Sequence, residues 1–316
     1  RKPGSDTANL SVLGYNPREF YSGRSPLEAL SIGVPMKDTD VALRCNIVTL
    51  SEEEDNYEDR TIIDHSSGEI STEAVLLEAV KKELETDIFH FYVGTSYRHC
   101  LIWENGEVVD LVQPHDVLGQ KIGDKLPENE ALRTMMKKSY DILVNHPINI
   151  ERKKKGLNPA TSCWFWGAGT KPALYPFTER THKKGAMISA VDLLKGIAVG
   201  TSMKVITVDG ANGGLDTNYE GKANAALDVL TKDGYDFVYV HLEGPDEMGH
   251  QGSVEKKVKA IERLDERIIR PIAEGLAEAG EDFRMVVLPD HPTPIRLRTH
   301  TSSPVPYLLY DSTQKA

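Results

Sequence analysis

Cysteine is scarce in this sequence, and basic residues are outnumbered by acidic ones. The chain of 316 residues has three cysteines, Cys45, Cys100 and Cys163, an odd number without any C-x-x-C spacing. This pattern excludes a disulfide framework and a thiolate zinc site, and it favours a reducing cytoplasm. The formal net charge of −11 argues against a nucleic-acid-binding protein, because such a protein carries a basic face.

Long apolar runs are absent as well. No run approaches the ~20 residues that span a bilayer, and the sequence as given shows no signal peptide, so we expect no membrane association. The chain begins at Arg1 without Met, inside a recognisable pattern, and we therefore expect a preceding segment to be missing here. No pattern in the sequence specifies an oligomeric state.

Short strand patterns and helical patterns alternate in the C-terminal half of the chain. Such alternation predicts parallel strands in a doubly wound α/β sheet, which binds ligands beyond the carboxyl ends of its strands. One helical pattern contains Pro271, which we expect to kink or interrupt it. The expected strands are Lys204–Val208, Asp236–Leu242, Arg284–Pro289 and Val305–Tyr310, and the expected helices are Lys222–Leu230 and Val254–Ala279.

The middle of the sequence has a different pattern, with strands joined by short connections. The runs DIFHFYV, RHCLIW and EVVDLVQ predict an antiparallel meander, and Asn105–Gly106 marks a tight hairpin between the last two. Helices are expected over Ser71–Glu85 and Glu128–Asn145. The pattern therefore predicts that this region is a separate α+β domain of ordinary size.

The α+β region interrupts the α/β pattern, which resumes near Gly185. We therefore expect a discontinuous α/β domain of residues 1–36 and 182–316. The α+β domain of residues 37–181 is expected to be inserted into it. No internal repeats separate the chain further.

Acids and histidines follow the expected strands of the C-terminal half. Asp246 and His250 follow one strand, Asp290 and His291 follow the next, and His300 precedes the last. Carboxylate and imidazole are the ligands that Zn²⁺ or Mn²⁺ takes without thiolates. Asp246 and His250 share a face if a helical turn follows the strand. On an extended backbone the adjacent Asp290 and His291 point in opposite directions, so each could serve one of two metals.

Five such ligands exceed the needs of a single catalytic zinc, which keeps a coordination position open. They suit a pair of metals about 4 Å apart, which clamps a phosphoryl group during transfer. For a lone histidine the ordinary interpretation is a hydrogen-bonded or exposed residue. The order of all five after consecutive strands favours a metal centre.

Ser5 is the candidate nucleophile. It begins SDTANLSVL, which reads as a helix, so Ser5 either caps that helix or attacks a substrate. A serine hydroxyl is too weak a nucleophile near neutral pH unless its alkoxide is stabilised, which a metal ion or a helix N-terminus can do. No Ser-His-Asp arrangement is evident, so metal activation is the natural alternative.

Several motifs carry a resemblance to a known family. PGSDTANLSVLGYNP, GPDEMGHQG, PDHPTP and RTHTSSPVP resemble cofactor-independent phosphoglycerate mutase of the archaeal type, in the alkaline phosphatase superfamily. Further similar stretches, including SGRSPLEALSIGV and GGLDTNYEGKA, extend the resemblance over nearly the whole chain. It implies an alkaline-phosphatase-like doubly wound sheet with an inserted α+β lid domain. It also implies interconversion of 3-phosphoglycerate and 2-phosphoglycerate through a phosphoserine, in glycolysis and gluconeogenesis, without 2,3-bisphosphoglycerate.

The resemblance assigns roles to the cluster. Ser5 matches the serine that becomes phosphorylated. One metal would be held by Asp246, His250 and His300, and the other by Asp290, His291 and Ser5. The ions are expected to be Mn²⁺, with Zn²⁺, Mg²⁺ or Co²⁺ as alternatives, because O/N sites accept several of these. The family's further aspartate ligand, at the end of a first strand before the serine, is absent from this sequence, which leaves the second site one carboxylate short.

Further residues are expected to bind the small-molecule phosphoglycerate substrate. Lys195, in DLLKGI, resembles the family's lysine that positions the phosphoryl group. The inserted domain would close as a lid and keep the intermediate dry. His115 acts on the hydroxyl proton, or Asp116 orients it or does that work itself. The candidates for binding the carboxylate, each of which could instead be an ordinary surface residue, are Arg98, His115, Asp116, Lys171 and, more weakly, Arg24.

Two other functions stay open. A phosphomonoesterase, phosphodiesterase or sulfatase of the same superfamily would share the metals and Ser5, but it needs access of water rather than a lid. A non-enzymatic domain could retain the metals for structure alone. The similarity of the inserted region favours the mutase over both.

Overall fold

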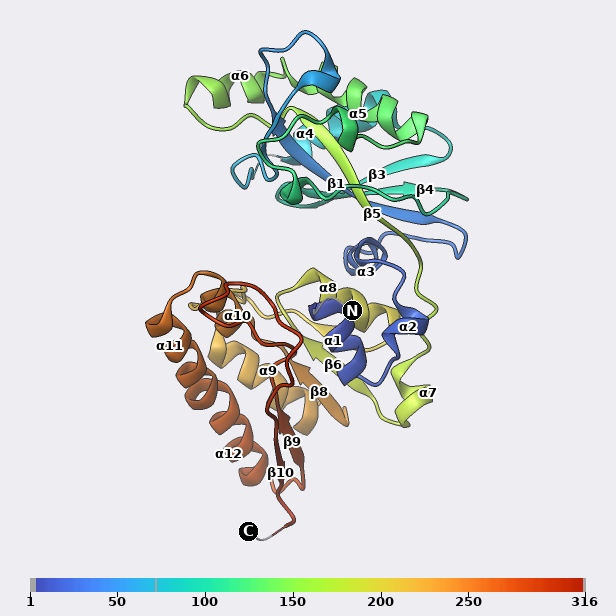
Figure 1. Cartoon of the computed structure of the whole chain (residues 1–316). Coiled ribbons are helices and arrows are strands. Elements are labelled where there is room, and N and C mark those ends of the chain that lie inside the picture. The colour runs from blue at the N-terminus through green and yellow to red at the C-terminus, as the bar shows by residue number, and fades with distance from the viewer. Residues whose placement is uncertain (1–3, 72, 315–316) are drawn as a thin grey trace. The chain divides into compact units, whose positions relative to one another are not determined.

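The computed structural model describes residues 4–71 and 73–314, and the chain forms two compact units (Figure 1). Unit 1 contains the residues up to Tyr21 and those from Ala173 onward, and unit 2 contains Ser22–Pro172. Both crossings lie earlier in the chain than the predicted ones at residues 36–37 and 181–182. The first differs because α3 (Arg24–Ser31) packs against β1 (Val41–Leu50) and β5 (Ser162–Thr170), which are strands of unit 2.

Unit 1 has the α/β architecture that the alternating pattern predicts. β6 (Gly185–Ile188) lies between β7 (Lys204–Ile206) and β8 (Phe237–Val240), and the three strands are parallel. α8 (Asp192–Gly200) connects β6 to β7, and α9 (Tyr219–Thr231) connects β7 to β8. Parallel neighbours need crossover connections of this kind, and they bring the carboxyl ends of the strands to one edge.

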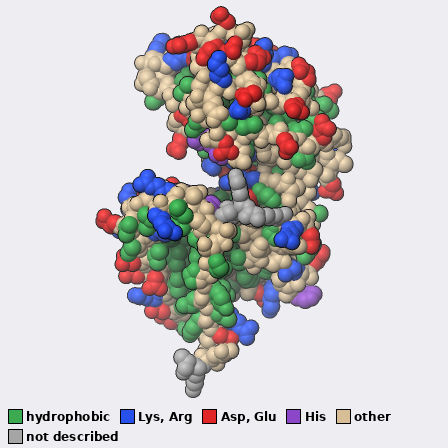
Figure 2. Space-filling view, in the orientation of Figure 1, with side chains coloured by type: hydrophobic (Ala, Val, Ile, Leu, Met, Phe, Trp, Pro, Cys, Tyr) green, Lys and Arg blue, Asp and Glu red, His purple; other side chains and the backbone are tan. Residues whose placement is uncertain are grey.

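The last two strands of unit 1 form a separate two-stranded sheet. β9 (Arg284–Val287) and β10 (Leu308–Asp311) are antiparallel, with Leu308 opposite Val287. The predicted parallel arrangement is therefore wrong for both strands: β9 pairs with none of β6, β7 and β8, and no helix separates it from β10. Figure 2 shows apolar side chains gathered over this part of unit 1, and those exposed on the two strands are Val286, Leu308, Leu309 and Tyr310.

The long helical pattern at the end of unit 1 is one continuous helix with a wide turn. α11 (Val254–Leu264) runs into the π-helical η4 (Asp265–Ile269) and then into α12 (Arg270–Glu278). Pro271 is the second residue of α12, so it does not end the helix. The wide turn before it supplies the room that a residue without an N–H requires. The other helices of unit 1 are α1 (Ser5–Val12), α2 (Pro17–Phe20), α7 (Phe177–Thr181) and α10 (Gly244–His250).

β1 is the centre of an antiparallel sheet in unit 2. It pairs with β2 (Ile62–Asp64), β4 (Arg98–Trp103) and β5, and β4 pairs in turn with β3 (Phe89–Thr95). All ten residues of β1 are buried, so the strand is covered on both faces. One face supports the main core of the unit, whose buried members include Leu43, Ile47, Leu77, Leu101, Leu132, Met136 and Phe165.

The helices of unit 2 match the sequence prediction, but one expected strand does not form. The sequence predicts helices over Ser71–Glu85 and Glu128–Asn145. The structure has α4 (Glu73–Leu84) and α5 (Glu130–Leu143) at these places. The run EVVDLVQ, residues 107–113, forms no strand; it lies against the core, and its Val112 carbonyl accepts a hydrogen bond from Trp164 Nε1 at 2.8 Å. β1 occupies the position beside β4 that the meander assigned to this run. The short elements are η1 (Tyr57–Asp59), η2 (Pro114–Asp116), η3 (Gly123–Lys125) and α6 (Pro147–Lys154).

Helix length also bears on membrane insertion. Within the described ranges, none of the helices combines the length and the apolar composition that crossing a bilayer requires. Each of the three cysteines is buried and free, including Cys45 and Cys163 on neighbouring strands of unit 2.

Candidate functional site

Two ligand candidates lie on a short helix that directly follows β8. α10 begins at Gly244, with Pro245 in its first turn, where a missing N–H costs no hydrogen bond. Asp246 and His250 are one turn apart on this helix, and His250 Nε2 lies 3.4 Å from Asp246 Oδ2. The predicted helical turn is therefore present, and it presents both side chains from one face.

His300 joins this pair from the segment between β9 and β10. Its Nε2 lies 3.0 Å from His250 Nε2 and 3.4 Å from Asp246 Oδ1. A metal with ligand bonds of about 2.0–2.2 Å would hold neighbouring ligand atoms roughly 3–3.5 Å apart. The three side chains therefore have the spacing and the donor atoms of a divalent-metal site.

Ser5, Asp290 and His291 form a second group. Ser5 is the first residue of α1, with Gly4 as its N-cap, so the serine does not itself cap the helix. His291 Nε2 lies 3.1 Å from Ser5 Oγ and 3.4 Å from Asp290 Oδ2. The expectation that Asp290 and His291 diverge is therefore wrong, because the chain bends after β9 instead of continuing as an extended strand.

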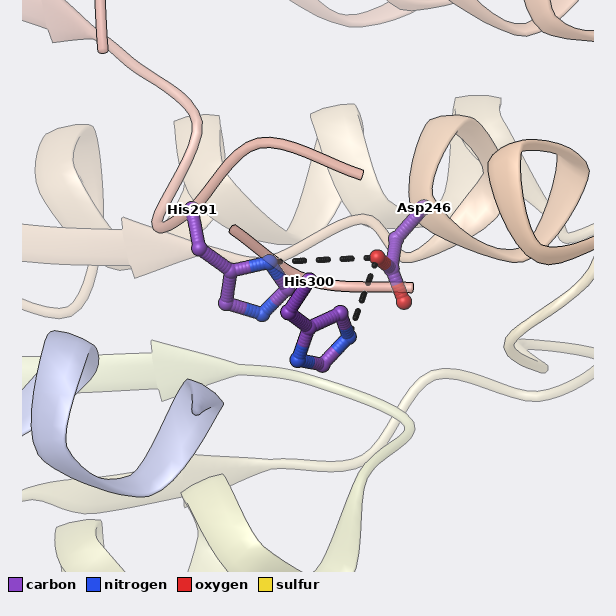
Figure 3. A group of neighbouring side chains, drawn as sticks. All are labelled: Asp246, His291 and His300. Atoms are coloured by element: carbon purple, nitrogen blue, oxygen red, sulfur yellow. Dashed lines mark ion pairs between the residues drawn. The ribbon is translucent and has the colours of Figure 1, made fainter. Parts of the chain in front are cut away.

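His291 connects the second group to Asp246 and His300 of the first, and Figure 3 shows these three side chains together. Its Nδ1 is 3.9 Å from Asp246 Oδ1, and its ring stacks on that of His300 with the centroids 3.7 Å apart. The ligand atoms of Asp246, His291 and His300 all lie within 4.8 Å of one another. The six residues thus form one continuous cluster within unit 1.

The electrostatics of the cluster suit a bound cation. In the part of the chain that the structure describes, the ion pairs of Asp246 and Asp290 are all with imidazoles, and none is with lysine or arginine. Burial lowers the pKa of His291, against the opposing effect of the Asp290 carboxylate. A neutral imidazole beside a carboxylate that no lysine or arginine neutralises is the donor set for a divalent metal ion.

Asn9, which the sequence pattern did not single out, joins the serine to the second group. Its buried Nδ2 donates to the Ser5 carbonyl at 2.7 Å and to Asp290 Oδ2 at 3.0 Å. Its Oδ1 accepts from the Tyr239 hydroxyl of β8 at 2.5 Å. An asparagine four residues after Ser5, one turn along the predicted helix, was the available signal in the sequence. Asn9 holds α1 against the segment that carries Asp290.

A cavity of about 450 Å³ adjoins the second group. Its lining includes Gly4, Arg18, Asp290 and His291, together with residues 301–305. Lys195 lies on α8, which packs against α1. The Lys195 Nζ forms its ion pair with Asp192 of its own helix, at 3.4 Å, rather than with a member of the cluster.

Basic side chains gather on one face of the unit 2 sheet. Arg24 and Arg44 both pair with Glu28, at 2.7 and 3.0 Å. Arg98 lies directly opposite Asn46 on the ladder of β1 and β4, two residues along from Arg44. Arg44 was not singled out from the sequence; a lone cation within the mostly apolar run VALRCNIVTL was the available signal.

The Arg44 guanidinium lies over the Trp166 ring, 4.4 Å from its centroid, and the His115 ring contacts the same tryptophan at 5.5 Å. Burial lowers the pKa of His115, and the Asp116 carboxylate opposes this shift. Asp116 is exposed and lies 3.9 Å from His115. Lys171 pairs with Asp38 at 3.9 Å, and no contact joins it to these residues in the described part of unit 2.

Comparisons with known proteins identify the family. A family model described as 2,3-bisphosphoglycerate-independent phosphoglycerate mutase matches residues 1–149. A protein of that name from Methanosarcina barkeri is 49% identical over 314 residues, covering 97% of this chain and 77% of the relative. The chain belongs to the 2,3-bisphosphoglycerate-independent phosphoglycerate mutase family. A "probable" mutase of the same name from Geobacter sulfurreducens is 47% identical, with 98% and 77% covered.

Solved structures share the fold of this chain. A protein structure from Pyrococcus horikoshii matches with a TM-score of 0.77 at 31% identity, over 98% of this chain and 73% of that one. A structure described as the cofactor-independent phosphoglycerate mutase of Thermoplasma acidophilum matches with a TM-score of 0.61 over 99% and 78%. Its identity of 24% supports the fold alone.

Proposed function

We propose that this member of the mutase family interconverts 3-phosphoglycerate and 2-phosphoglycerate through a phosphoserine at Ser5. The observation that carries the proposal is the convergence on Ser5: its Oγ lies 3.1 Å from His291 Nε2, beside the cluster of acids and imidazoles. The names of relatives up to 49% identical support the substrate. Those names also specify independence from 2,3-bisphosphoglycerate.

The proposal includes two divalent metal ions. One would be held by Asp246, His250 and His300, and the other by Asp290, His291 and Ser5. Mn²⁺ is the first candidate, and Zn²⁺, Mg²⁺ or Co²⁺ could occupy the same oxygen and nitrogen ligands. When bound, such ions supply positive charge that favours the serine alkoxide and offsets the charge of the phosphoryl oxygens.

The reaction uses Ser5 twice. Its Oγ, after losing its proton, forms a bond to phosphorus while the bond from phosphorus to the 3-oxygen of glycerate breaks, and that oxygen takes up a proton. The 2-hydroxyl of the retained glycerate then loses its proton, attacks the phosphoserine and releases Ser5. Asn9 keeps the helix that carries Ser5 in register with Asp290 through both steps. Lys195 is the candidate for positioning the phosphoryl group.

Unit 2 is proposed as the lid of an alkaline-phosphatase-like fold whose sheet is doubly wound. Its task would be to exclude water and to hold glycerate between the two transfers, because water at that stage gives hydrolysis. The cations at Arg24 and Arg98 support this assignment. His115 or Asp116 would handle the hydroxyl proton, and Lys171 completes the candidate set. A cytoplasmic location fits three free cysteines.

The test is conversion of 3-phosphoglycerate by the full chain, coupled to enolase, without added 2,3-bisphosphoglycerate. We expect product that disappears with a chelator and returns with Mn²⁺, because the phosphoryl transfer depends on the metal centre. Release of inorganic phosphate without isomerisation would instead identify a hydrolase that uses the same cluster.

A further inference from the structure

Arg44 is a buried guanidinium that the two transfer steps do not explain. It lies in the middle of β1, and only 7% of the residue is exposed. A guanidinium removed from water is destabilising unless acceptors satisfy its N–H groups. Its five donors therefore need partners.

The described residues supply few of those partners. Arg44 Nε forms an ion pair with Glu28 Oε2 at 3.0 Å, but its N–H is not aligned for a hydrogen bond. Among the described residues no hydrogen bond starts from either terminal nitrogen, and these two atoms retain some exposure while Nε is fully buried. The two terminal nitrogens of the planar donor fork are therefore partly exposed, and they have no acceptor among residues 4–71 and 73–314.

Arg60 shows how the same unit treats a buried arginine that serves structure. Its residue exposure is 8%, and its guanidinium lies over the Tyr140 ring, 4.1 Å from the centroid. Its Nη1 donates to the Ser51 carbonyl at 2.9 Å and lies 3.9 Å from Glu54. Arg60 thus resembles Arg44 in burial, stacking and pairing, but its terminal nitrogen has a protein acceptor.

The surroundings of Arg44 hold its fork in place. The guanidinium rests on the Trp166 ring at 4.4 Å, and Trp166 Nε1 donates to Asn46 Oδ1 at 3.1 Å. The charged groups that act on it are the Glu28 carboxylate and two further guanidiniums, those of Arg24 and Arg98. Positive charge is therefore in excess around a rigid donor, which is the arrangement that binds an oxyanion.

We propose that Arg44 is a further substrate-binding residue, whose terminal nitrogens donate to the carboxylate of the phosphoglycerate. The planar fork matches the two oxygens of a carboxylate. The choice of the carboxylate over the phosphoryl group rests on the proposed function, which assigns the phosphoryl group to Ser5 in unit 1. Glu28 and Trp166 orient the guanidinium from behind and leave its outer edge to the ligand.

Two ligands that differ only in the carboxylate test this assignment. The affinities of the Mn²⁺-loaded full chain for 3-phosphoglycerate and for glycerol 3-phosphate, which has a hydroxymethyl group in place of the carboxylate, are measured by calorimetry. Arg44→Lys keeps the charge but loses the fork, so we expect it to weaken 3-phosphoglycerate about tenfold. Binding of glycerol 3-phosphate should change by less than about twofold. The double variant Arg44→Met/Glu28→Gln, which removes the ion pair as a whole, should weaken 3-phosphoglycerate further.

Arg60→Met is the matched control, because it also deletes a buried, stacked arginine of unit 2. We expect it to lower the melting temperature without changing the affinity for 3-phosphoglycerate. Equal affinity for 3-phosphoglycerate in the parent and in folded Arg44→Lys overturns the inference, and so does an equal loss for both ligands. A parent chain that binds 3-phosphoglycerate without isomerising it contradicts the proposed function alone, since the binding comparison still decides the role of Arg44.

Discussion

The two units of this chain gather opposite kinds of polar side chain. Unit 1 collects carboxylates, imidazoles and a hydroxyl on α1, α10 and the segment between β9 and β10, where His291 links two groups. Unit 2 collects guanidiniums on the face of an antiparallel sheet, with Glu28 between Arg24 and Arg44. The first set attracts cations and the second attracts anions.

The units also differ in how rigidly the polar atoms are held. In unit 1 the ligand residues lie in a short helix and in loops, so their geometry depends on hydrogen bonds such as those of Asn9. In unit 2 Arg44 extends from the most buried strand of the sheet. A bound metal can draw loop residues together, whereas a strand supplies its geometry before any ligand arrives.

Replacing the proposed nucleophile, Ser5, tests the role assigned to the cluster of unit 1. Ser5→Ala should lower turnover by at least about 10³-fold, because it removes the hydroxyl that is proposed to carry the phosphoryl group. Metal content, measured by atomic emission, should remain nearly that of the parent, since Ser5 is one ligand of one site. A variant that retains substantial activity would rule out the phosphoserine route.

Removing Asn9, which hydrogen-bonds to the Ser5 carbonyl and to Asp290, tests how the geometry of the same cluster is maintained. Asn9→Ala should lower kcat about 10- to 100-fold with KM little changed, because groups that orient metal ligands have effects of this size. Tyr239→Phe removes only one of the hydrogen bonds to Asn9 and should have a smaller effect in the same direction. If kcat stays at the parent value in folded Asn9→Ala, Asn9 does not position the site.

On the unit 2 side the corresponding change is Arg98→Ala. We expect KM for 3-phosphoglycerate to rise about tenfold, or the phosphoryl group to pass to water and appear as inorganic phosphate. Steady-state kinetics and a phosphate assay separate the two results. An unchanged enzyme would remove Arg98 from the set that binds substrate, while Arg60→Met again controls for loss of a buried arginine.

The smallest effect concerns the stability of unit 2 at acidic pH. Burial lowers the pKa of His99 to about 4 from its usual 6.5, so the folded unit keeps this imidazole neutral while the unfolded chain protonates it. The free energy of unfolding should therefore have its full value above pH 6.5. It should fall as the pH is lowered toward 4, by about 1.4 kcal/mol per pH unit at most.

Melting temperatures of the parent and of His99→Gln, measured from pH 7 to pH 4.5, check this dependence. The variant should show a shallower decline over the acidic range. His182→Asn, which replaces an exposed histidine of unit 1, should retain the parent's slope. Parallel curves for the parent and His99→Gln would contradict the assignment.

Local periodicity predicted much of the architecture. The helical patterns around α4, α5 and α9 were read from apolar spacing, and the Asp246–His250 pair was placed on one helical face from its i, i+4 separation. β1 and β5 were missed because a strand buried on both faces shows no alternation, and the run at residues 107–113 was assigned their place. Pairing between distant strands is a property of the whole sheet, which a local pattern does not contain.

Some residues of the candidate site could likewise be predicted from the sequence, and others could not. Asp246 and His250 could be found because residues that follow a strand of a parallel sheet lie at its carboxyl edge; Asp290 and His291 were found by the same reasoning, although β9 belongs to the separate antiparallel sheet. The convergence of Asp290 with His291 could not, since it depends on the bend after β9. Asn9 and Arg44 act through contacts with residues far along the chain, Asp290 and Trp166, and only the folded chain brings these together.

The π-helical turn before Pro271 holds about one residue more than an α-helical turn does. Ile268, Ile272 and Leu276 contribute to the core of unit 1 from this helix. Deleting one residue from Asp265–Ile269 would convert the wide turn into an ordinary α-helical turn and keep Ile272 and Leu276 on the core side. A deletion elsewhere in α11 or α12 would rotate the residues beyond it by about 100°, so homologous chains with an intact core should carry single-residue gaps within this turn rather than beside it.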